Sequence, residues 1–122
     1  MPISYNNNFL HFDNINLNQF SEETLTPYYL YSASLITDNF NTYEASLREF
    51  NHLICYSVKA NSNLSVLEAI AKLGGGADVV SLGEYKRALI AGIDPRKIVF
   101  SGVGKQDFEI AEILKSSLLQ FN

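Results

Sequence analysis

Lys59 is the residue whose type and position most clearly suggest chemistry in this sequence. It directly follows the mainly apolar residues 53–58 and precedes a polar stretch, residues 60–63. If residues 53–58 form a strand of a parallel sheet, Lys59 lies at the carboxyl end of that strand, where ligand sites gather in α/β proteins. An amine that is partly desolvated there has a lowered pKa and can form a Schiff base with an aldehyde. The residues alone still favour an ordinary solvated lysine, because most lysines in proteins are exposed to water.

Three other patterns that could indicate a cofactor or metal site fail on inspection. Residues 102–106 superficially match a phosphate-binding P-loop, but Val99 stands where the first glycine belongs and Gln106 where Ser or Thr belongs. The glycines at 74–76 lead into a predicted strand and not out of one, so they are no dinucleotide fingerprint. Two separated histidines and one cysteine supply no metal-ligand set.

Strands and helices alternate from residue 53 onward and predict an α/β fold with a parallel sheet. The predicted strands are residues 53–58, 77–80 and 98–100, with a fourth opening at 118–122. The predicted helices are residues 65–73, 81–91 and about 107–115, two of them opened by the capping boxes at 65–68 and 81–84. Earlier in the chain, residues 28–31 are predicted as a strand and residues 36–50 as a helix capped by Ser32 or Ser34. This alternation fits either an open doubly wound sheet or a (β/α) barrel.

Composition and charge exclude several classes of function. Nine Lys and Arg against thirteen Asp and Glu give a net charge of −4, and the basic residues are scattered, which argues against a nucleic-acid partner. No apolar run approaches the roughly 20 residues of a membrane span and no export signal opens the chain, so we expect no membrane partner and a cytoplasmic location. Cys55, the single cysteine, is expected to pack among apolar neighbours. Residues 1–25 are Asn-rich and are expected to form an arm, with regular structure beginning near Thr26.

Four segments of the chain resemble motifs of the fold-type III pyridoxal-phosphate-dependent decarboxylases, and most closely those of the diaminopimelate decarboxylase branch. In chain order these segments are residues 26–31, 56–63, 74–84 and 95–105. Four motifs in the right order at sensible spacing are far more specific than any one of them. The resemblance covers residues 26–122 and implies part of an alanine-racemase-like (β/α)8 barrel, namely about the first three βα units and the start of a fourth strand.

The resemblance also implies roles for individual residues. Lys59 would be the Schiff-base lysine that holds pyridoxal 5'-phosphate, and Asp78 would lie near the cofactor. Asn61, Ser81 and Glu84 match family positions close to the site. The residues themselves leave structural alternatives open, since Ser81 and Glu84 form a capping box, Asp78 can cap the same helix, and Asn61 suits a turn.

The sequence departs from the family pattern at three positions and lacks other parts of it. Leu82 stands where the family usually has a small residue, while Ser57 and Ser101 are mild variations. The resemblance further implies a histidine against the cofactor ring, a glycine-rich phosphate site, a glutamate for the ring nitrogen and a C-terminal β-domain, all of which would lie beyond residue 122. Neither His11 nor His52 matches a family position.

The resemblance therefore implies decarboxylation of a small amino acid in the parent family. We prefer diaminopimelate, which would place the family's reaction in lysine biosynthesis, with ornithine, arginine and carboxynorspermidine as alternative substrates. A different hypothesis is that the chain is a non-catalytic remnant of a split or truncated decarboxylase gene, or pairs with a separately encoded remainder. We expect the chain assayed alone not to turn over substrate, and its uncovered sheet edge to favour self-association.

Overall fold

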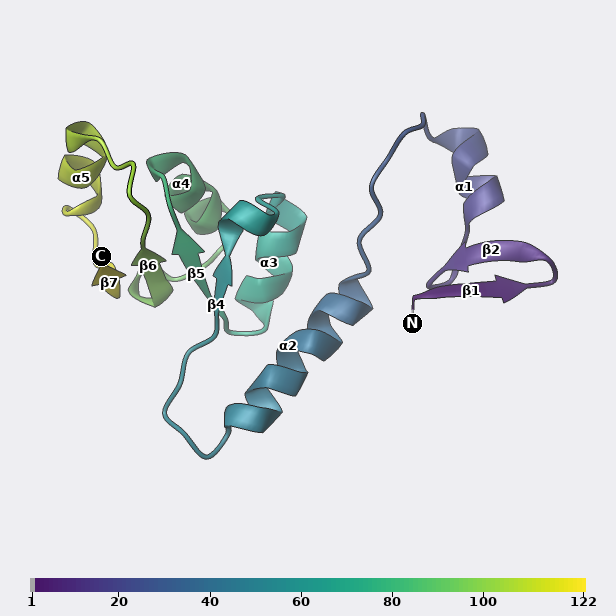
Figure 1. The fold of residues 1–122 in the computed structure, drawn as a ribbon, viewed down its shortest axis with the longest axis horizontal. Helices are drawn as coiled ribbons and strands as arrows, with labels where there is room; N and C mark the ends of the chain where they lie inside the picture. The colour runs from purple at the N-terminus through teal and green to yellow at the C-terminus, as the bar shows by residue number, and fades with distance from the viewer. Residues whose placement is uncertain (1) are drawn as a thin grey trace. The chain divides into compact units, whose positions relative to one another are not determined.

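The structure, a computed structural model, describes residues 2–122 and divides them into two compact units (Figure 1). The first unit ends at Ile36 and the second begins at Thr37. The division therefore falls inside helix α2 (Ala33–Leu47).

The first unit contains a small antiparallel sheet of three strands, β1 (Ile3–Asn6), β2 (Phe9–Phe12) and β3 (Ile15–Asn16), followed by helix α1 (Leu17–Glu23). Asn7 and Asn8 form the turn between β1 and β2 with φ values of 49° and 66°, a left-handed conformation that Asn tolerates better than most residues. Asn16 caps α1, because its side-chain oxygen accepts the Asn18 N–H at 3.0 Å. The expectation that regular structure begins only near Thr26 is therefore wrong, and these asparagines mark a turn and a cap.

Residues 28–31 form no strand, so that prediction is also wrong. The Tyr28 ring packs edge-on against the Phe20 ring with centroids 5.3 Å apart, and its hydroxyl lies 2.6 Å from the Ser21 hydroxyl. A strand needs backbone partners on a neighbouring strand, and neither sheet of the described residues includes this segment. Tyr28 thus packs against another ring, whereas Tyr29 and Tyr31 are exposed, and an aromatic-rich composition does not distinguish this arrangement from a strand.

Helix α2 confirms the predicted helix and one of its two candidate caps. The Ser32 hydroxyl accepts the Leu35 N–H at 3.0 Å, so Ser32 is the N-terminal cap. Phe40 is the buried residue of this helix, and a Cβ placed on Gly75 would lie 2.8 Å from its ring. Phe40, which belongs to the second unit, thus packs against Gly75, the residue directly before β5.

The second unit is built on a parallel four-stranded sheet in the order β4 (Cys55–Ser57), β5 (Gly76–Val79), β6 (Ile98–Phe100) and β7 (Gln120–Phe121). The connections carry helices α3 (Leu64–Lys72), α4 (Leu82–Ile90) and α5 (Asp107–Ile113), with short 3-10 turns η1 (Val58–Ala60) and η2 (Pro95–Lys97). Each strand pairs with the next in the sequence, and the order never reverses. A doubly wound sheet reverses its order at a switch point, whereas a (β/α) barrel continues in one direction, so the strand order favours the barrel.

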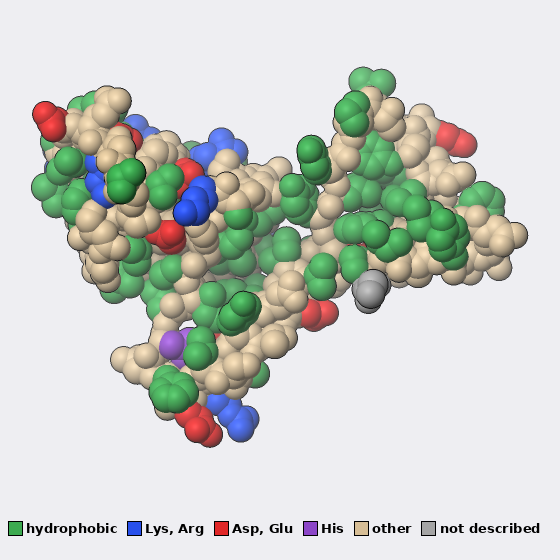
Figure 2. All heavy atoms as spheres, viewed as in Figure 1, with side chains coloured by type: hydrophobic (Ala, Val, Ile, Leu, Met, Phe, Trp, Pro, Cys, Tyr) green, Lys and Arg blue, Asp and Glu red, His purple; other side chains and the backbone are tan. Residues whose placement is uncertain are grey.

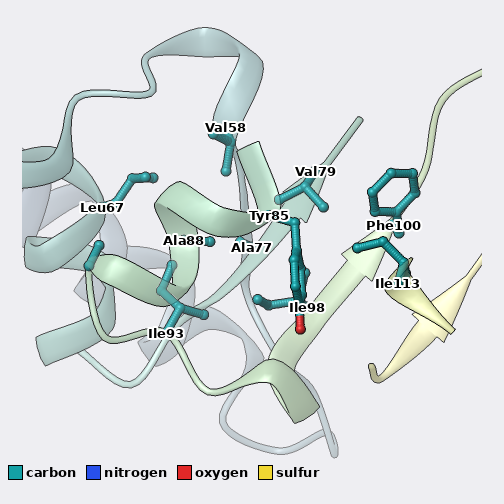
Figure 3. Close-up of a cluster of buried hydrophobic side chains, with 11 residues drawn as sticks. Val58, Leu67, Ala77, Val79, Tyr85, Ala88, Ile93, Ile98, Phe100 and Ile113 are labelled. Atoms are coloured by element: carbon teal, nitrogen blue, oxygen red, sulfur yellow. The ribbon is translucent and has the colours of Figure 1, made fainter. Parts of the chain in front are cut away.

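The core of the second unit lies on one face of this sheet (Figure 3). Burial alternates along β5 and β6, where Ala77, Val79, Ile98 and Phe100 are fully buried and Asp78 and Val99 between them are not. Helices cover the buried face, with Leu67 of α3, Ala88 of α4 and Ile113 of α5 all fully buried against it. Asp78 consequently faces the opposite side of the sheet from the helix-covered core.

The first predicted capping box is wrong and the second is right with a small change. Asn63, not Ser65, caps α3, its side-chain oxygen accepting the Ser65 N–H at 2.9 Å, so Ser65 lies inside the helix. Ser81 caps α4 as predicted and accepts the Glu84 N–H at 3.2 Å, while Glu84 reaches back one residue further, to the Val80 N–H at 2.9 Å.

Two of the three residues at 74–76 need to be glycine, each for a different structural reason. Gly74 follows α3 with φ of 84°, the left-handed conformation that ends many helices. A Cβ on Gly76 would lie 2.1 Å from the Lys97 carbonyl oxygen, so only glycine lets β5 lie this close to the residue that precedes β6.

The last part of the second unit, from α5 to β7, exposes apolar side chains. Four apolar side chains of α5, of β7 and of the segment between them are exposed: Phe108, Leu114, Leu119 and Phe121. Figure 2 shows hydrophobic side chains on the surface of the molecule. None of the helices in residues 2–122 is both long enough and apolar enough to cross a membrane.

Candidate functional site

Lys59 lies in the 3-10 turn η1, just beyond the carboxyl end of β4, so the sequence predicted the correct end of the strand but not the turn. The strand ends at Ser57, and Val58, which is fully buried, anchors the following turn η1 in the core. Lys59 comes next and is exposed. Among residues 2–122 the structure gives the Lys59 ammonium no hydrogen-bond or ion-pair partner. The backbone at Lys59 is thus fixed by a buried neighbour while its amine remains free.

Asp78 lies on the neighbouring strand and is held by two serine hydroxyls. Ser57 and Asp78 are register partners on β4 and β5, and the Ser57 hydroxyl donates to Asp78 Oδ2 at 3.4 Å. Ser101, directly after β6, donates to Asp78 Oδ1 at 2.5 Å. The Asp78 carboxylate therefore bridges the carboxyl ends of three adjacent strands, on the sheet face opposite the core. Its side chain does not cap α4, which Ser81 caps instead.

The loop that follows Lys59 is tied down by side chains. The Tyr56 hydroxyl donates to the Asn61 carbonyl oxygen at 3.3 Å, and Arg87 of α4 donates through Nε to the Ser62 carbonyl oxygen at 2.7 Å. The Asn61 side chain accepts the Asn63 N–H at 2.9 Å, which is the geometry of a turn residue. Asn61 therefore shapes the loop of which Lys59 is part.

Ser81 and Glu84 are both engaged with the backbone at the start of α4. Glu109 of α5 supports the same region from outside, accepting the Leu82 N–H at 2.8 Å and the Gln106 N–H at 3.1 Å. These two N–H groups hold the pKa of Glu109 below its usual value. The loop after β5 is consequently shaped by three side chains that bond to backbone groups.

Cys55 lies on β4 beside this site and is partly buried. Burial, and after it the negative charge of Asp78, raises the pKa of the Cys55 thiol. The thiol lies 3.7 Å from the Lys97 carbonyl oxygen. The raised pKa keeps the Cys55 thiol protonated. A protonated thiol suits a packing role, whereas a nucleophile needs the thiolate.

Sequence reasoning overlooked three residues of this site. Ser57 and Ser101 were noted only as variations, yet both bond Asp78, and Arg87 was not considered. The strand register contains the signal for the serines, because Ser57 is the partner of Asp78, and Ser101 lies two residues beyond Val99, the partner of Asp78 on β6. The bond of Arg87 to a carbonyl 25 residues away leaves no such pattern in the sequence.

Comparison with known proteins gives a consistent result. Residues 33–122 match the family model for the pyridoxal binding domain of pyridoxal-dependent decarboxylases. A diaminopimelate decarboxylase of Helicobacter pylori is 55% identical over 97 residues, which cover 80% of this chain and 24% of that protein. This chain therefore spans about a quarter of the length of that relative.

Solved structures agree in fold. The diaminopimelate decarboxylase of Helicobacter pylori, complexed with L-lysine, matches with a TM-score of 0.85 and 48% identity over 88% of this chain and 27% of that one. The diaminopimelate decarboxylase of M. jannaschii, in co-complex with L-lysine, matches with a TM-score of 0.93 and 31% identity over 98% and 29%. These likenesses confirm the predicted fold class, part of an alanine-racemase-like (β/α)8 barrel. The chain belongs to the pyridoxal-dependent decarboxylase family, and most of it corresponds to that family's pyridoxal binding domain.

Proposed function

We propose that this chain is the part of a diaminopimelate decarboxylase that bonds the aldehyde of pyridoxal 5'-phosphate, and that Lys59 forms this bond. The observation that carries the proposal is the free Lys59 amine at the carboxyl end of a parallel strand, beside a carboxylate on the next strand. An aldehyde needs a primary amine that is not engaged elsewhere, and Lys59 meets this requirement.

The other lysines support the choice of Lys59. Four of them donate to carbonyl or carboxylate oxygens: Lys72 to Glu68, Lys97 to Gly74, Lys105 to Gly102 and Asn122, and Lys115 to Glu112. Within residues 2–122 only Lys59 and Lys86 have no such partner. Lys86 lies in the middle of α4, away from a strand end. Lys59 alone thus combines a free amine with the sheet edge where ligand sites gather.

We assign Asp78 the role of a fixed hydrogen-bond acceptor at the same edge. A carboxylate has about four lone-pair positions, and the two serine hydroxyls use two of them. The remaining positions are available to a donor on the cofactor or substrate. Asn61, Ser81 and Glu84 act on the site through the backbone of the loops that they shape.

Pyridoxal phosphate, when bound, supplies an electron sink for the pair of electrons left behind as a carboxylate departs as carbon dioxide. In this proposal the chain contributes a bonded loop around Lys59 and, at the same end of the sheet, an Asp78 carboxylate held by two serine hydroxyls. Diaminopimelate is the proposed substrate because relatives of 40–55% identity are named for it. This assignment rests on those names and extends to this chain as a proposal.

The test is covalent labelling of the 122-residue chain. Pyridoxal phosphate is added, the product is reduced with borohydride, and the labelled lysine is identified by peptide mass mapping. We expect Lys59 to be labelled faster than Lys86 by roughly tenfold, because Lys59 lies at the end of the sheet where a ligand can be held, whereas Lys86 lies in the middle of a helix.

Two variants serve as matched controls. Lys59→Ala should abolish the fast labelling, whereas Lys86→Ala should leave it unchanged. Labelling that is equal at Lys59 and Lys86, or that persists at the same rate in Lys59→Ala, contradicts the proposed role.

A further inference from the structure

The loop between Lys59 and α3 is held from outside by one charged side chain, that of Arg87. Arg87 lies in the last turn of α4, and its Nε donates to the Ser62 carbonyl oxygen at 2.7 Å. Lys59 lies three residues before Ser62 and Asn63 is the residue that caps α3. The bond therefore connects α4 to the short segment between the lysine and the next helix.

This segment would otherwise be fixed mainly by its own residues. Asn61 and Asn63 bond to backbone N–H groups two residues ahead of each, and the Tyr56 hydroxyl bonds the Asn61 carbonyl at the longer distance of 3.3 Å. On the other side of Lys59, Val58 is fully buried. The Arg87 bond is the shortest of these contacts and the one that comes from a different βα unit, so it sets the position of the loop against α4.

We infer that Arg87 is a positioning residue for Lys59, which it serves by fixing the Ser62 carbonyl and thereby the direction in which the Lys59 loop leaves the sheet. This inference rests on the proposed function, since it concerns the reaction of Lys59 with an aldehyde. A guanidinium bond to a carbonyl is charge-assisted and directional, which suits it to hold a loop in one place. A reacting group that is misplaced by about 1 Å can lose up to about a hundredfold in rate.

The side chain of glutamine makes the inference testable. Its Nε2 occupies the same place along the side chain as Nε of arginine, so Arg87→Gln keeps an N–H donor there and removes the charge. Arg87→Met has a similar length and also lacks the charge, but it has no donor. The two variants therefore differ in the hydrogen bond and agree in net charge.

The experiment measures the rate of pyridoxal phosphate labelling at Lys59, relative to Lys115 of the same molecule, in the wild type and both variants. Lys115 serves as the reference because it lies beyond α5 and pairs with Glu112. We expect Arg87→Met to slow labelling at Lys59 by roughly tenfold and Arg87→Gln to recover most of the wild-type rate. Amide hydrogen exchange at Asn63, measured without cofactor, should accelerate in Arg87→Met and return towards the wild type in Arg87→Gln.

The outcomes separate this inference from the proposed function. If the wild type labels Lys59 no faster than Lys115, the proposed role of Lys59 fails, and amide exchange at Asn63 still decides whether Arg87 fixes the loop. If the wild type labels Lys59 selectively and Arg87→Met does so equally well, the positioning role is overturned while the role of Lys59 stands. It is also overturned if Arg87→Gln is as slow as Arg87→Met, because the effect would then come from charge or packing.

Discussion

Two lysines follow strands of the same parallel sheet, and their surroundings are opposite. Lys59 comes two residues after β4 and has no partner among residues 2–122, although the loop around it is bonded to neighbouring elements. Lys105 comes five residues after β6, and its ammonium donates to the carbonyl oxygens of Gly102 at 2.5 Å and Asn122 at 2.6 Å.

Lys105 is also held by aromatic rings. The rings of Phe100 and Phe121 stack with centroids 5.7 Å apart, and the Lys105 ammonium lies 5.6 Å and 5.2 Å from their centres. Lys105 thus connects β6 to β7, whereas Lys59 has no hydrogen-bond or ion-pair partner among residues 2–122. The difference teaches that a position after a strand does not by itself leave a lysine amine available for a ligand. What separates the two is whether the amine already serves the fold.

The largest expected effect is on stability, and it should appear at one lysine only. Lys105→Met should lower the free energy of unfolding by about 1 to 2 kcal/mol, because it removes two hydrogen bonds and two cation–π contacts. Lys59→Met should change it by no more than about 0.5 kcal/mol, as expected for an exposed side chain without partners. Urea unfolding of both variants and the wild type measures the two values.

The same pair of variants can break the comparison. A loss in Lys59→Met as large as that in Lys105→Met would mean that Lys59 also serves the fold. A negligible loss in Lys105→Met would mean that its contacts contribute nothing, and the contrast between the two amines would then lose its energetic basis.

Much of the second unit could be predicted from sequence because its signals are local. The alternation of strands and helices, the cap at Ser81 and the position of Lys59 after β4 all follow from residues within a few places of each other. The first unit could not be predicted this way, because its asparagines gave a composition typical of an arm. Their left-handed turn at Asn7 and Asn8 and the cap at Asn16 become evident only once the strands pair.

The contacts that complete the candidate site were beyond sequence reasoning for a related reason. The bonds of Ser57 and Ser101 to Asp78, and of Arg87 to Ser62, join residues 21 to 25 positions apart. Such contacts depend on strand register and on the placement of α4, which no local pattern specifies. The family resemblance predicted Lys59 and Asp78 as site residues, whereas only the structure shows the contacts of Asp78 and of the loop around Lys59.

A smaller effect on stability should depend on pH, and its pH dependence should differ between the regions around Lys105 and Lys59. On the Lys105 side, Glu109 accepts the N–H of Gln106, the residue next to Lys105, and that of Leu82. These bonds lower the pKa of Glu109 from its usual 4.5. A carboxylate with a lowered pKa in the folded state contributes stability above its unfolded pKa, and that contribution is lost as the pH falls through the folded value.

We therefore expect Glu109→Gln to be less stable than the wild type at neutral pH, with the difference shrinking in acid below about pH 4.5. Urea unfolding across this range measures the effect. Glu49→Gln is the control, since Glu49 is exposed and has no partner among the described residues. A difference between Glu109→Gln and wild type that stays constant with pH would show that the carboxylate charge is not involved.

The smallest expected effect on stability concerns His52, which lies in the segment before β4. Its pH dependence is opposite to that of Glu109, because the pKa of His52 is raised and that of Glu109 is lowered. His52 Nδ1 lies 2.9 Å from the Phe50 carbonyl oxygen, and Nε2 lies 3.2 Å from Glu44 Oε2. A neutral imidazole has one N–H and its cation has two, so the cation satisfies both acceptors. The pKa of His52 is raised from 6.5, first by the Phe50 carbonyl and then, against the lowering effect of burial, by Glu44. The stability that these contacts contribute is full below the unfolded pKa of His52 and is lost as the pH rises through the folded pKa.

Proton NMR titration of the His52 ring, assigned with His11→Gln, should give a pKa above 6.5, and Glu44→Gln should lower it. A His52 pKa that is the same in Glu44→Gln and wild type would remove Glu44 from this account and leave the Phe50 carbonyl as the cause.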